Sequence, residues 1–342
     1  MDNNMKAHPT NDVIIESFIS PEQQLPIVLT ARESTLDLNE FAKDNKAYIN
    51  ALKCRYGAVL FRGFNINSAQ QFADVIESTS DTALAYTERS SPRDTVSGHI
   101  YTSTSQPKES EIFLHTEQSF NLTFPLNIYF NCHVESSEGG CTPLADTRKI
   151  FNRIPAHTRQ KFIDKNYLYQ RNFMKHMYLS WQECFQTQAQ SDVERYCKDN
   201  HIDFEWGDDD ITLTTRQVRP VVSQHPHTNE LCWFNHCTFF NVATLPSEIQ
   251  AFLRSSYSDK ELPNHTFYGD GTPIEPEVIV ALIDAYNAEK VTFRWQQGDV
   301  LMVDNMLVAH GREPYQGDRL VLTGMSEPCE LVHVSTSRFI TK

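Results

Sequence analysis

The stretch "FLHTEQSF", Phe113 to Phe120, places a histidine and a glutamate two positions apart among apolar residues. In a β-strand, residues i and i+2 project from the same face, so we expect His115 and Glu117 to present an imidazole and a carboxylate to one point in space. A third metal ligand must come from elsewhere in the chain. His310, which follows the apolar run "DVLMVDNMLVA", is the best candidate.

Two histidines and one carboxylate form the facial triad of non-heme Fe(II) oxygenases, which leaves metal positions open for a co-substrate and O₂. An H-x-E pattern alone is weak evidence, because the chain has 13 histidines and His133 and His236 compete for the third position. The same ligand types also serve catalytic zinc, so a zinc hydrolase is an alternative, although a helical H-E-x-x-H is absent from the sequence. A non-catalytic cupin-like binder is a further alternative.

The fold around this stretch is predicted to be mainly β. Apolar runs bounded by turn-forming residues have the length of buried strands; they cover residues 57–64, 126–134, 298–305 and 319–325. Helical patterns fall between them, including a capping box expected from Ser191 and Glu194. The strands do not alternate regularly with helices, which disfavours a doubly wound parallel sheet. We therefore expect a jelly-roll or cupin-like fold with helical insertions.

The predicted organisation is a single oxygenase domain over residues 1–342. We expect residues 1–50 to form an N-terminal extension packed on the core. We expect residues 150–290, approximately, to form an insertion that carries helices and substrate loops. Single β domains with insertions reach this length.

Composition excludes some partners. The chain has 30 basic and 44 acidic residues and a net charge of −14, which disfavours nucleic acid. The polar N-terminus lacks a secretory leader, and no run approaches the length of about 18 apolar residues that a membrane span needs. We therefore expect a cytoplasmic protein whose eight cysteines are reduced. Residues 148–175 hold eight basic residues and one acid, which indicates either a solvated face or a docking patch for an acidic carrier protein.

Two further segments equip the expected iron site for a dicarboxylate co-substrate. Thr142, in "GGCTPLAD", offers a hydroxyl, and Arg319, in "GREPYQGDRLVL", offers a planar guanidinium suited to a carboxylate. Arg312 is the alternative arginine. Other parts of the sequence provide candidates for substrate contacts. They are Arg216, Trp233 and Asn235, with Tyr101 and Arg62 as weaker candidates. A purely structural role is about equally expected for Arg216, Trp233 and Asn235.

The chain resembles the taurine dioxygenase-like (TauD/TfdA) family of Fe(II)/2-oxoglutarate-dependent oxygenases. It is most similar to the group that contains the syringomycin aspartyl hydroxylase, and more distantly to clavaminate synthase. The resemblance covers nearly the whole chain after about residue 50, through segments that include "YGAVLFRGF", "YTERSSPRDTVSGHIYTST", "LHTEQSF", "GGCTPLADTRKI", "HPHTNELCWFNH" and "GDVLMVDNMLVAHGREPYQGDR".

This resemblance implies a double-stranded β-helix that binds iron through His115, Glu117 and His310. It implies that Thr142 and Arg319 bind the distal carboxylate of 2-oxoglutarate. The implied reaction couples decarboxylation of 2-oxoglutarate to hydroxylation of an unactivated C–H bond, with desaturation or cyclisation as alternatives. The implied substrate is an amino acid or amino-acid-derived molecule, free or tethered to a carrier protein, in antibiotic or other specialised biosynthesis. A carboxylate at position 117 argues against a halogenase, whose iron keeps that position for chloride.

Overall fold

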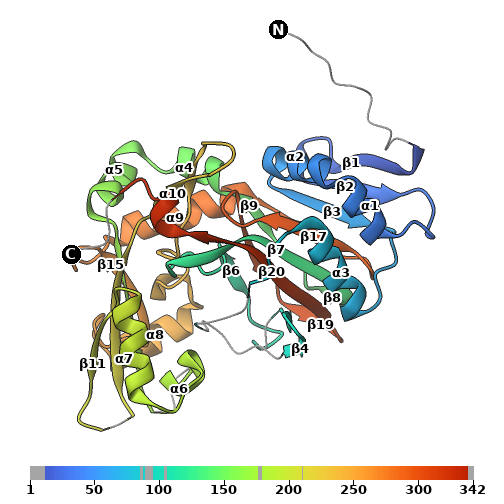
Figure 1. Ribbon diagram of the computed structural model, residues 1–342. Helices are drawn as coiled ribbons and strands as arrows, with labels where there is room; N and C mark the ends of the chain where they lie inside the picture. Colours follow the sequence, from blue (N-terminus) through green and yellow to red (C-terminus); the bar gives the residue numbers. More distant parts are fainter. Residues whose placement is uncertain are drawn as a thin grey trace.

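Two β-sheets that share one apolar core form the centre of the molecule, as expected for a jelly roll (Figure 1). The computed structural model describes residues 12–84, 88, 95–103, 106–175, 179–209 and 211–337. The larger sheet has the order β1 (Ile14–Ser20), β2 (Gln23–Ala31), β3 (Ala58–Arg62), β17 (Val300–Asp304), β7 (Thr123–Val134), β20 (Leu320–Glu330), β5 (Ile100–Thr102) and β4 (Thr95–Ser97). The smaller sheet has the order β16 (Lys290–Val291), β9 (Leu144–Asp146), β18 (Val308–Arg312) and β6 (Ile112–His115).

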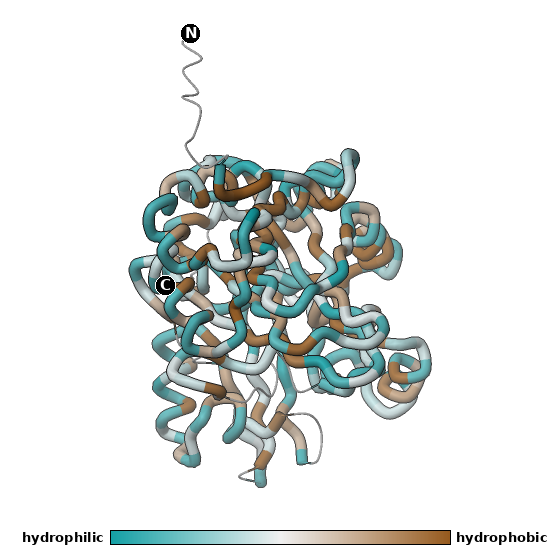
Figure 2. Tube along the Cα trace, turned by 90° about the vertical axis from the view of Figure 1, so that its right-hand side faces the viewer, coloured by the Kyte–Doolittle hydropathy of each residue, from teal (hydrophilic) through white to brown (hydrophobic). Residues whose placement is uncertain are grey.

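The strands at the middle of the larger sheet are apolar on both faces because both faces are covered. Leu301 and Val303 of β17 pack in the core between the two sheets, whereas Val300 and Met302 pack in a second core on the opposite side. This second core also contains residues of α1 (Leu38–Asp44), α2 (Lys46–Tyr56) and α3 (Ala69–Thr79). The period-two alternation of a strand thus divides one continuous apolar run between two cores. Figure 2 shows hydrophobic segments passing through the interior of the fold.

The N-terminal segment is part of the main sheet. Strand β1 pairs antiparallel with β2, and β2 pairs in parallel with β3. Within the predicted extension, residues 14–31 therefore extend the larger sheet at its edge, and α1 follows them. Residues 1–11 lie outside the described residues, as does much of the motif quoted for residues 86–104.

The predicted insertion contains a sheet that the sequence did not indicate. Its antiparallel order is β11 (Asp203–Trp206), β12 (Leu213–Arg219), β10 (Tyr167–Phe173) and β15 (Asn264–Tyr268). The helices of this region are α4 (Thr147–Arg153), α5 (Ala156–Lys165), α6 (Trp181–Phe185), α7 (Gln190–Asp199), α8 (Ser247–Ser256) and α9 (Pro276–Glu289). Short elements complete the fold: β8 (Glu138–Gly139), β13 (Val222–Gln224), β14 (Leu231–Trp233), η2 (Val242–Thr244), β19 (Tyr315–Gln316) and α10 (Leu331–Val334).

The prediction of a capping box formed by Ser191 and Glu194 is wrong. Helix α7 already includes Ser191, and its N-cap is Ala189. The same S-x-x-E pattern does form a capping box one helix earlier, where Ser180 and Glu183 open α6.

The basic stretch is largely neutralised within the chain. Five of its eight basic residues form ion pairs with acidic side chains; these are Arg148, Arg153, Lys161, Lys165 and Arg171. Arg159 instead donates to the carbonyl of Phe151. This surface therefore presents much less free positive charge than the sequence suggested. None of the helices in the described part of the chain has the length and apolar character needed to cross a bilayer.

Candidate metal centre

His115 and His310 lie directly opposite each other on neighbouring strands. His115 ends β6, His310 is on β18, and the two residues are antiparallel partners in the sheet. Their ring centroids are 4.5 Å apart, and both side chains are buried. Two residues that are 195 positions apart in the sequence are thus placed together by one pair of strands.

Glu117 reaches the same place by a turn. Strand β6 ends at His115, so Glu117 lies beyond the strand. The two side chains therefore do not come together as residues i and i+2 of one strand, which was the expected reason. The chain turns after Glu117, and Gln118 adopts a positive φ of 54°. The Glu117 carboxylate lies 3.9 Å from Nε2 of His310 and is buried.

Asn305 holds the backbone of Glu117. Its side-chain oxygen accepts from the Glu117 N–H at 2.6 Å, and its amide nitrogen donates to the carbonyls of Glu117 and Pro125, both at 2.8 Å. Asn305 is buried between β17 and β18. The preceding Asp304 accepts from the N–H groups of Met306 and Leu307, which fixes this turn in place.

Hydrogen bonds also orient the histidines of this region. Nδ1 of His115 lies 2.9 Å from the carbonyl of Phe113, which fixes the tautomer whose Nε2 carries a lone pair. His236, one of the competing histidines, instead uses Nδ1 in a 2.6 Å hydrogen bond with Ser119. Burial, reinforced by the neighbouring His115, holds the pKa of His236 well below its ordinary value. His236 is therefore a neutral neighbour of the cluster.

The three expected ligands form the one cluster of metal-binding side chains found among the described residues. One ligand atom each from His115, Glu117 and His310 lies within 4.8 Å of the others. Atoms that are each about 2 Å from one metal are at most about 4 Å apart, so a small side-chain movement closes this set on an ion. The donor types fit the facial triad of non-heme iron. His133 is outside the cluster.

Thr142, Arg312 and Arg319 all line the cavity of about 670 Å³ into which His115 and His310 open. The Thr142 hydroxyl accepts from Nε1 of Trp295 at 3.1 Å. Nε of Arg319 donates to the carbonyl of Gly140 at 3.0 Å. Gly140 has a φ of +69°, and a Cβ there would lie 3.0 Å from the Arg319 side chain, so glycine is required in this contact.

The two arginines differ in how their terminal nitrogens are used. Those of Arg312 donate to the carbonyls of Gln106, Pro107 and Ser110. Those of Arg319 form no hydrogen bond or ion pair with any residue that the structure describes, whereas Nε is bonded to Gly140. Burial, followed by the charge of Arg312, lowers the pKa of Arg319 to about 10, so it remains cationic at neutral pH. Arg319 can therefore accept a carboxylate from the cavity, whereas Arg312 is occupied.

The expected substrate residues lie away from this cavity. Trp233 is fully buried and packs against Phe162, and Tyr101 packs with Met325. The amide of Asn235 donates to the carbonyl of Val221 and accepts from the Cys237 N–H.

The two arginines among these candidates are bound to protein groups. Arg216 on β12 contacts Gln170 and Glu205, and Arg62 forms an ion pair of 2.7 Å with Asp299. None of the five candidates is among the residues that line the cavity, so their role in substrate binding stays a prediction.

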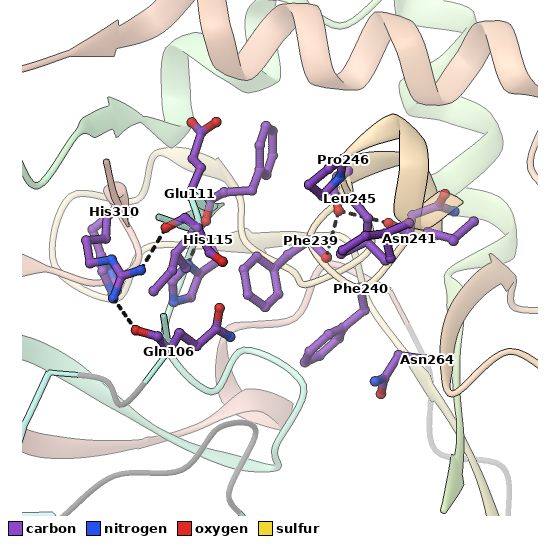
Figure 3. Close-up of a pocket in the computed structure, with 18 of the residues that line it drawn as sticks. Gln106, Glu111, His115, Phe239, Phe240, Asn241, Leu245, Pro246, Asn264 and His310 are labelled. Carbon is purple, nitrogen blue, oxygen red and sulfur yellow. Dashed lines mark hydrogen bonds between the residues drawn. The ribbon is translucent and has the colours of Figure 1, made fainter. Parts of the chain in front are cut away.

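The cavity wall that the sequence did not reveal follows the "CWFNH" motif. Phe239 stands 4.4 Å from the His115 ring, and the wall continues through Phe240 to Leu245 and Pro246 (Figure 3). A Phe-Phe pair next to apolar residues is typical of a core, and no polar pattern distinguishes it. The only sequence feature that could have pointed to Phe239 was its position three residues after His236.

Comparisons with known proteins agree with this geometry. Residues 22–326 match the family model described as "Taurine catabolism dioxygenase TauD, TfdA family". The dapdiamide synthesis protein DdaC of Enterobacter agglomerans is 36% identical over 301 residues, which cover 88% of this chain and 91% of that protein. A clavaminate synthase-like protein of Arabidopsis thaliana is 28% identical over 292 residues, covering 83% and 85%.

A similar fold is seen in the crystal structure of PvcB from Pseudomonas aeruginosa, described elsewhere as an Fe, α-ketoglutarate-dependent oxygenase from an isonitrile synthetic pathway. The TM-score is 0.53 at 14% identity, and the match covers 95% of this chain and 94% of that chain. The chain therefore belongs to the TauD/TfdA family and is a dioxygenase that uses Fe(II) and 2-oxoglutarate.

Proposed function

We propose that this protein hydroxylates an unactivated C–H bond of an amino-acid-derived small molecule in the biosynthesis of a specialised metabolite. The observation that carries the proposal is the joint placement of His115, Glu117 and His310 beside a cavity that also presents Arg319. The relative DdaC is named for dapdiamide synthesis, which supports a biosynthetic role.

Within this proposal, His115, Glu117 and His310 hold Fe(II), and Arg319 with Thr142 binds the distal carboxylate of 2-oxoglutarate. Fe(II), when bound, supplies the redox chemistry that joins O₂, 2-oxoglutarate and substrate into succinate, CO₂ and hydroxylated product. The chain itself orients the ligands through Asn305 and the Phe113 carbonyl. The Phe239 ring beside His115 limits the access of water on that side.

The charge pattern favours a free small-molecule substrate over one carried by an acidic protein, because the chain presents no large cationic surface in residues 148–175 of the described structure. Five basic residues of the stretch 148–175 are already paired with acids of the same chain. Lys149 and Lys175 form no ion pair within the described chain, so an acidic carrier protein would meet few unpaired cations there.

The test is succinate release from purified protein with Fe(II), ascorbate, O₂ and 2-oxoglutarate. Candidate substrates are free amino acids, acylated amino acids and aminoacyl carrier proteins, and His310→Ala is the control. We expect turnover above the control and a product that has gained one oxygen atom. A product that has lost two hydrogen atoms would instead indicate desaturation or cyclisation. No turnover above the control with any substrate would reject the proposal.

A further inference from the structure

The cavity has an apolar wall that begins beside the metal ligand His115. Six large hydrophobic residues line it there: Phe239, Phe240, Leu245, Ile249, Phe252 and Leu253. Positions 249, 252 and 253 have the three- and four-residue spacing that places side chains on one face of a helix, here α8. One face of α8 is therefore turned toward the cavity.

Three residues of this wall are exposed to solvent. Leu245 is 38% exposed, Ile249 47% and Phe252 62%. These three residues line the same cavity, whereas single exposed hydrophobic residues need no explanation. Contiguous exposed apolar surface marks a binding site.

Two polar residues in this part of the wall, Asn241 and Thr244, are hydrogen-bonded to other protein groups. The amide of Asn241 donates to Thr266 at 3.0 Å and accepts from the Ala243 N–H at 3.1 Å. The Thr244 hydroxyl donates to the carbonyl of Asn241 at 2.8 Å. The wall therefore offers mainly hydrophobic contact.

Cationic groups for a second small anion are lacking among the described lining residues. Arg312 is used by three carbonyls, and Arg319 is the group we assign to 2-oxoglutarate. Glu111, the remaining charged lining residue besides the metal ligand histidines, is 4.0 Å from Lys290. A small acidic substrate would thus find no further counterion among the lining residues that the structure describes, although a cavity of about 670 Å³ has room for a drug-sized ligand.

From these observations we propose that the substrate carries an extended apolar group, an acyl chain or an aryl ring, that lies against the face of α8 formed by Ile249, Phe252 and Leu253. The amino-acid part with the reacting C–H bond then lies toward His115 and His310. This inference rests on the proposed function, because it requires the metal centre to be the site of reaction. It separates the protein from oxygenases of free, strongly polar amino acids.

The first test measures binding, with N-dansyl-L-alanine as a fluorescent probe that joins an aryl group to an amino acid. The protein is loaded with Fe(II) and 2-oxoglutarate without O₂. Phe252→Asp is compared with Val280→Asp, which changes an equally exposed hydrophobic residue on α9, 56% exposed and outside the cavity. Burial of one large apolar side chain contributes about 1.5–3 kcal/mol, so Phe252→Asp should raise the dissociation constant about tenfold or more. Val280→Asp should leave it unchanged.

The second test measures succinate release with free L-aspartate and L-leucine and with their N-hexanoyl derivatives. We expect the N-hexanoyl forms to stimulate turnover and Phe252→Asp to raise their KM more than it lowers kcat. The visible band of the Fe(II)–2-oxoglutarate complex separates the two hypotheses. Its absence from the wild-type protein rejects the proposed function. Its presence, with equal probe binding in all three proteins or equal stimulation by free aspartate, rejects the apolar subsite.

Discussion

The amide of Asn305 hydrogen-bonds both backbone polar groups of Glu117, the N–H at 2.6 Å and the carbonyl at 2.8 Å. Asn305 stands five positions before His310, on the turn that leads into β18. One buried side chain therefore ties the turn that carries the carboxylate to the strand that carries a histidine. This contact positions two of the three expected ligands relative to each other.

Asn305→Ala should weaken metal binding and lower stability together. The variant leaves buried backbone groups of Glu117 without partners, at about 1–3 kcal/mol each, and outer-shell changes of this kind typically cost 10–100-fold in metal affinity. Mn(II) titration and urea unfolding measure the two effects. Asn131→Ala is the matched control, because that buried amide donates to the carbonyl of Asp299 at 3.1 Å. It should lose stability without losing metal affinity; equal loss of affinity in both variants would contradict a positioning role.

Glu117→Ala should abolish stoichiometric Fe(II) retention, because it removes the only carboxylate of the cluster. Two histidines alone leave the site without the charge that a facial triad supplies. The measurement is metal content after anaerobic gel filtration, together with the visible band formed with 2-oxoglutarate. Glu138→Ala, an exposed glutamate of β8, should behave as wild type. Full activity in Glu117→Ala would mean that another residue is the ligand.

Arg319→Lys and Arg312→Lys should have different consequences. Lysine cannot reproduce the two-pronged contact of a guanidinium with a carboxylate. A charge-assisted hydrogen bond contributes about 1.5–3 kcal/mol, so Arg319→Lys should raise the KM for 2-oxoglutarate by about tenfold or more. Arg312→Lys should chiefly lower the unfolding temperature, since that side chain binds three carbonyls. Steady-state kinetics and thermal unfolding distinguish them; the reverse pattern would reassign the co-substrate to Arg312.

The protein should lose stability between neutral pH and mild acid because of the buried His265. Burial lowers its pKa from 6.5 to about 4. Nδ1 accepts from the Val242 N–H at 3.4 Å, beside the cavity wall. The unfolded chain takes up a proton below about pH 6.5 while the folded chain does not, so this stability is present above pH 6.5 and is lost as the pH falls toward 4.

At pH 5 the expected loss from His265 is about 2 kcal/mol. His265→Gln should reduce the difference in unfolding free energy between pH 7.5 and pH 5 by this amount, measured by urea unfolding. Lys43, in the last turn of α1, provides a control as Lys43→Gln. An unchanged pH dependence in His265→Gln would show that other groups titrate.

The sequence predicted the ligand cluster because the ligand types are visible in it, although the strand alternation expected for Glu117 was incorrect, since β6 ends at His115. The substrate contacts stay predictions, because polarity alone does not show which group is already bound. The amide of Asn235, for example, contacts Val221 and Cys237. Phe239 was missed for the opposite reason: a cavity wall and a core have the same composition.

Short sequence patterns were also insufficient to predict where some helices and strands begin. Ser180 and Ser191 both begin S-x-x-E patterns, yet only Ser180 caps a helix, because the position of each helix start depends on packing beyond those four residues. Strand β2, which lies between β1 and β3, was not recognised either. Its pairing with β3 is parallel and joins segments 32 positions apart, from Ile27 to Val59, so no hairpin turn marks it.

The direct pairing of His115 with His310 has a consequence for how this enzyme can diversify. Their separation is set by the spacing of two hydrogen-bonded strands, independently of the residues between them in the sequence. Natural recombination or laboratory grafting could therefore replace the segment that carries Phe239 and α8 while leaving the metal ligands in register. Chimeras that take this segment from a relative should keep the chemistry and exchange the substrate, which makes the segment the natural unit for engineering new products.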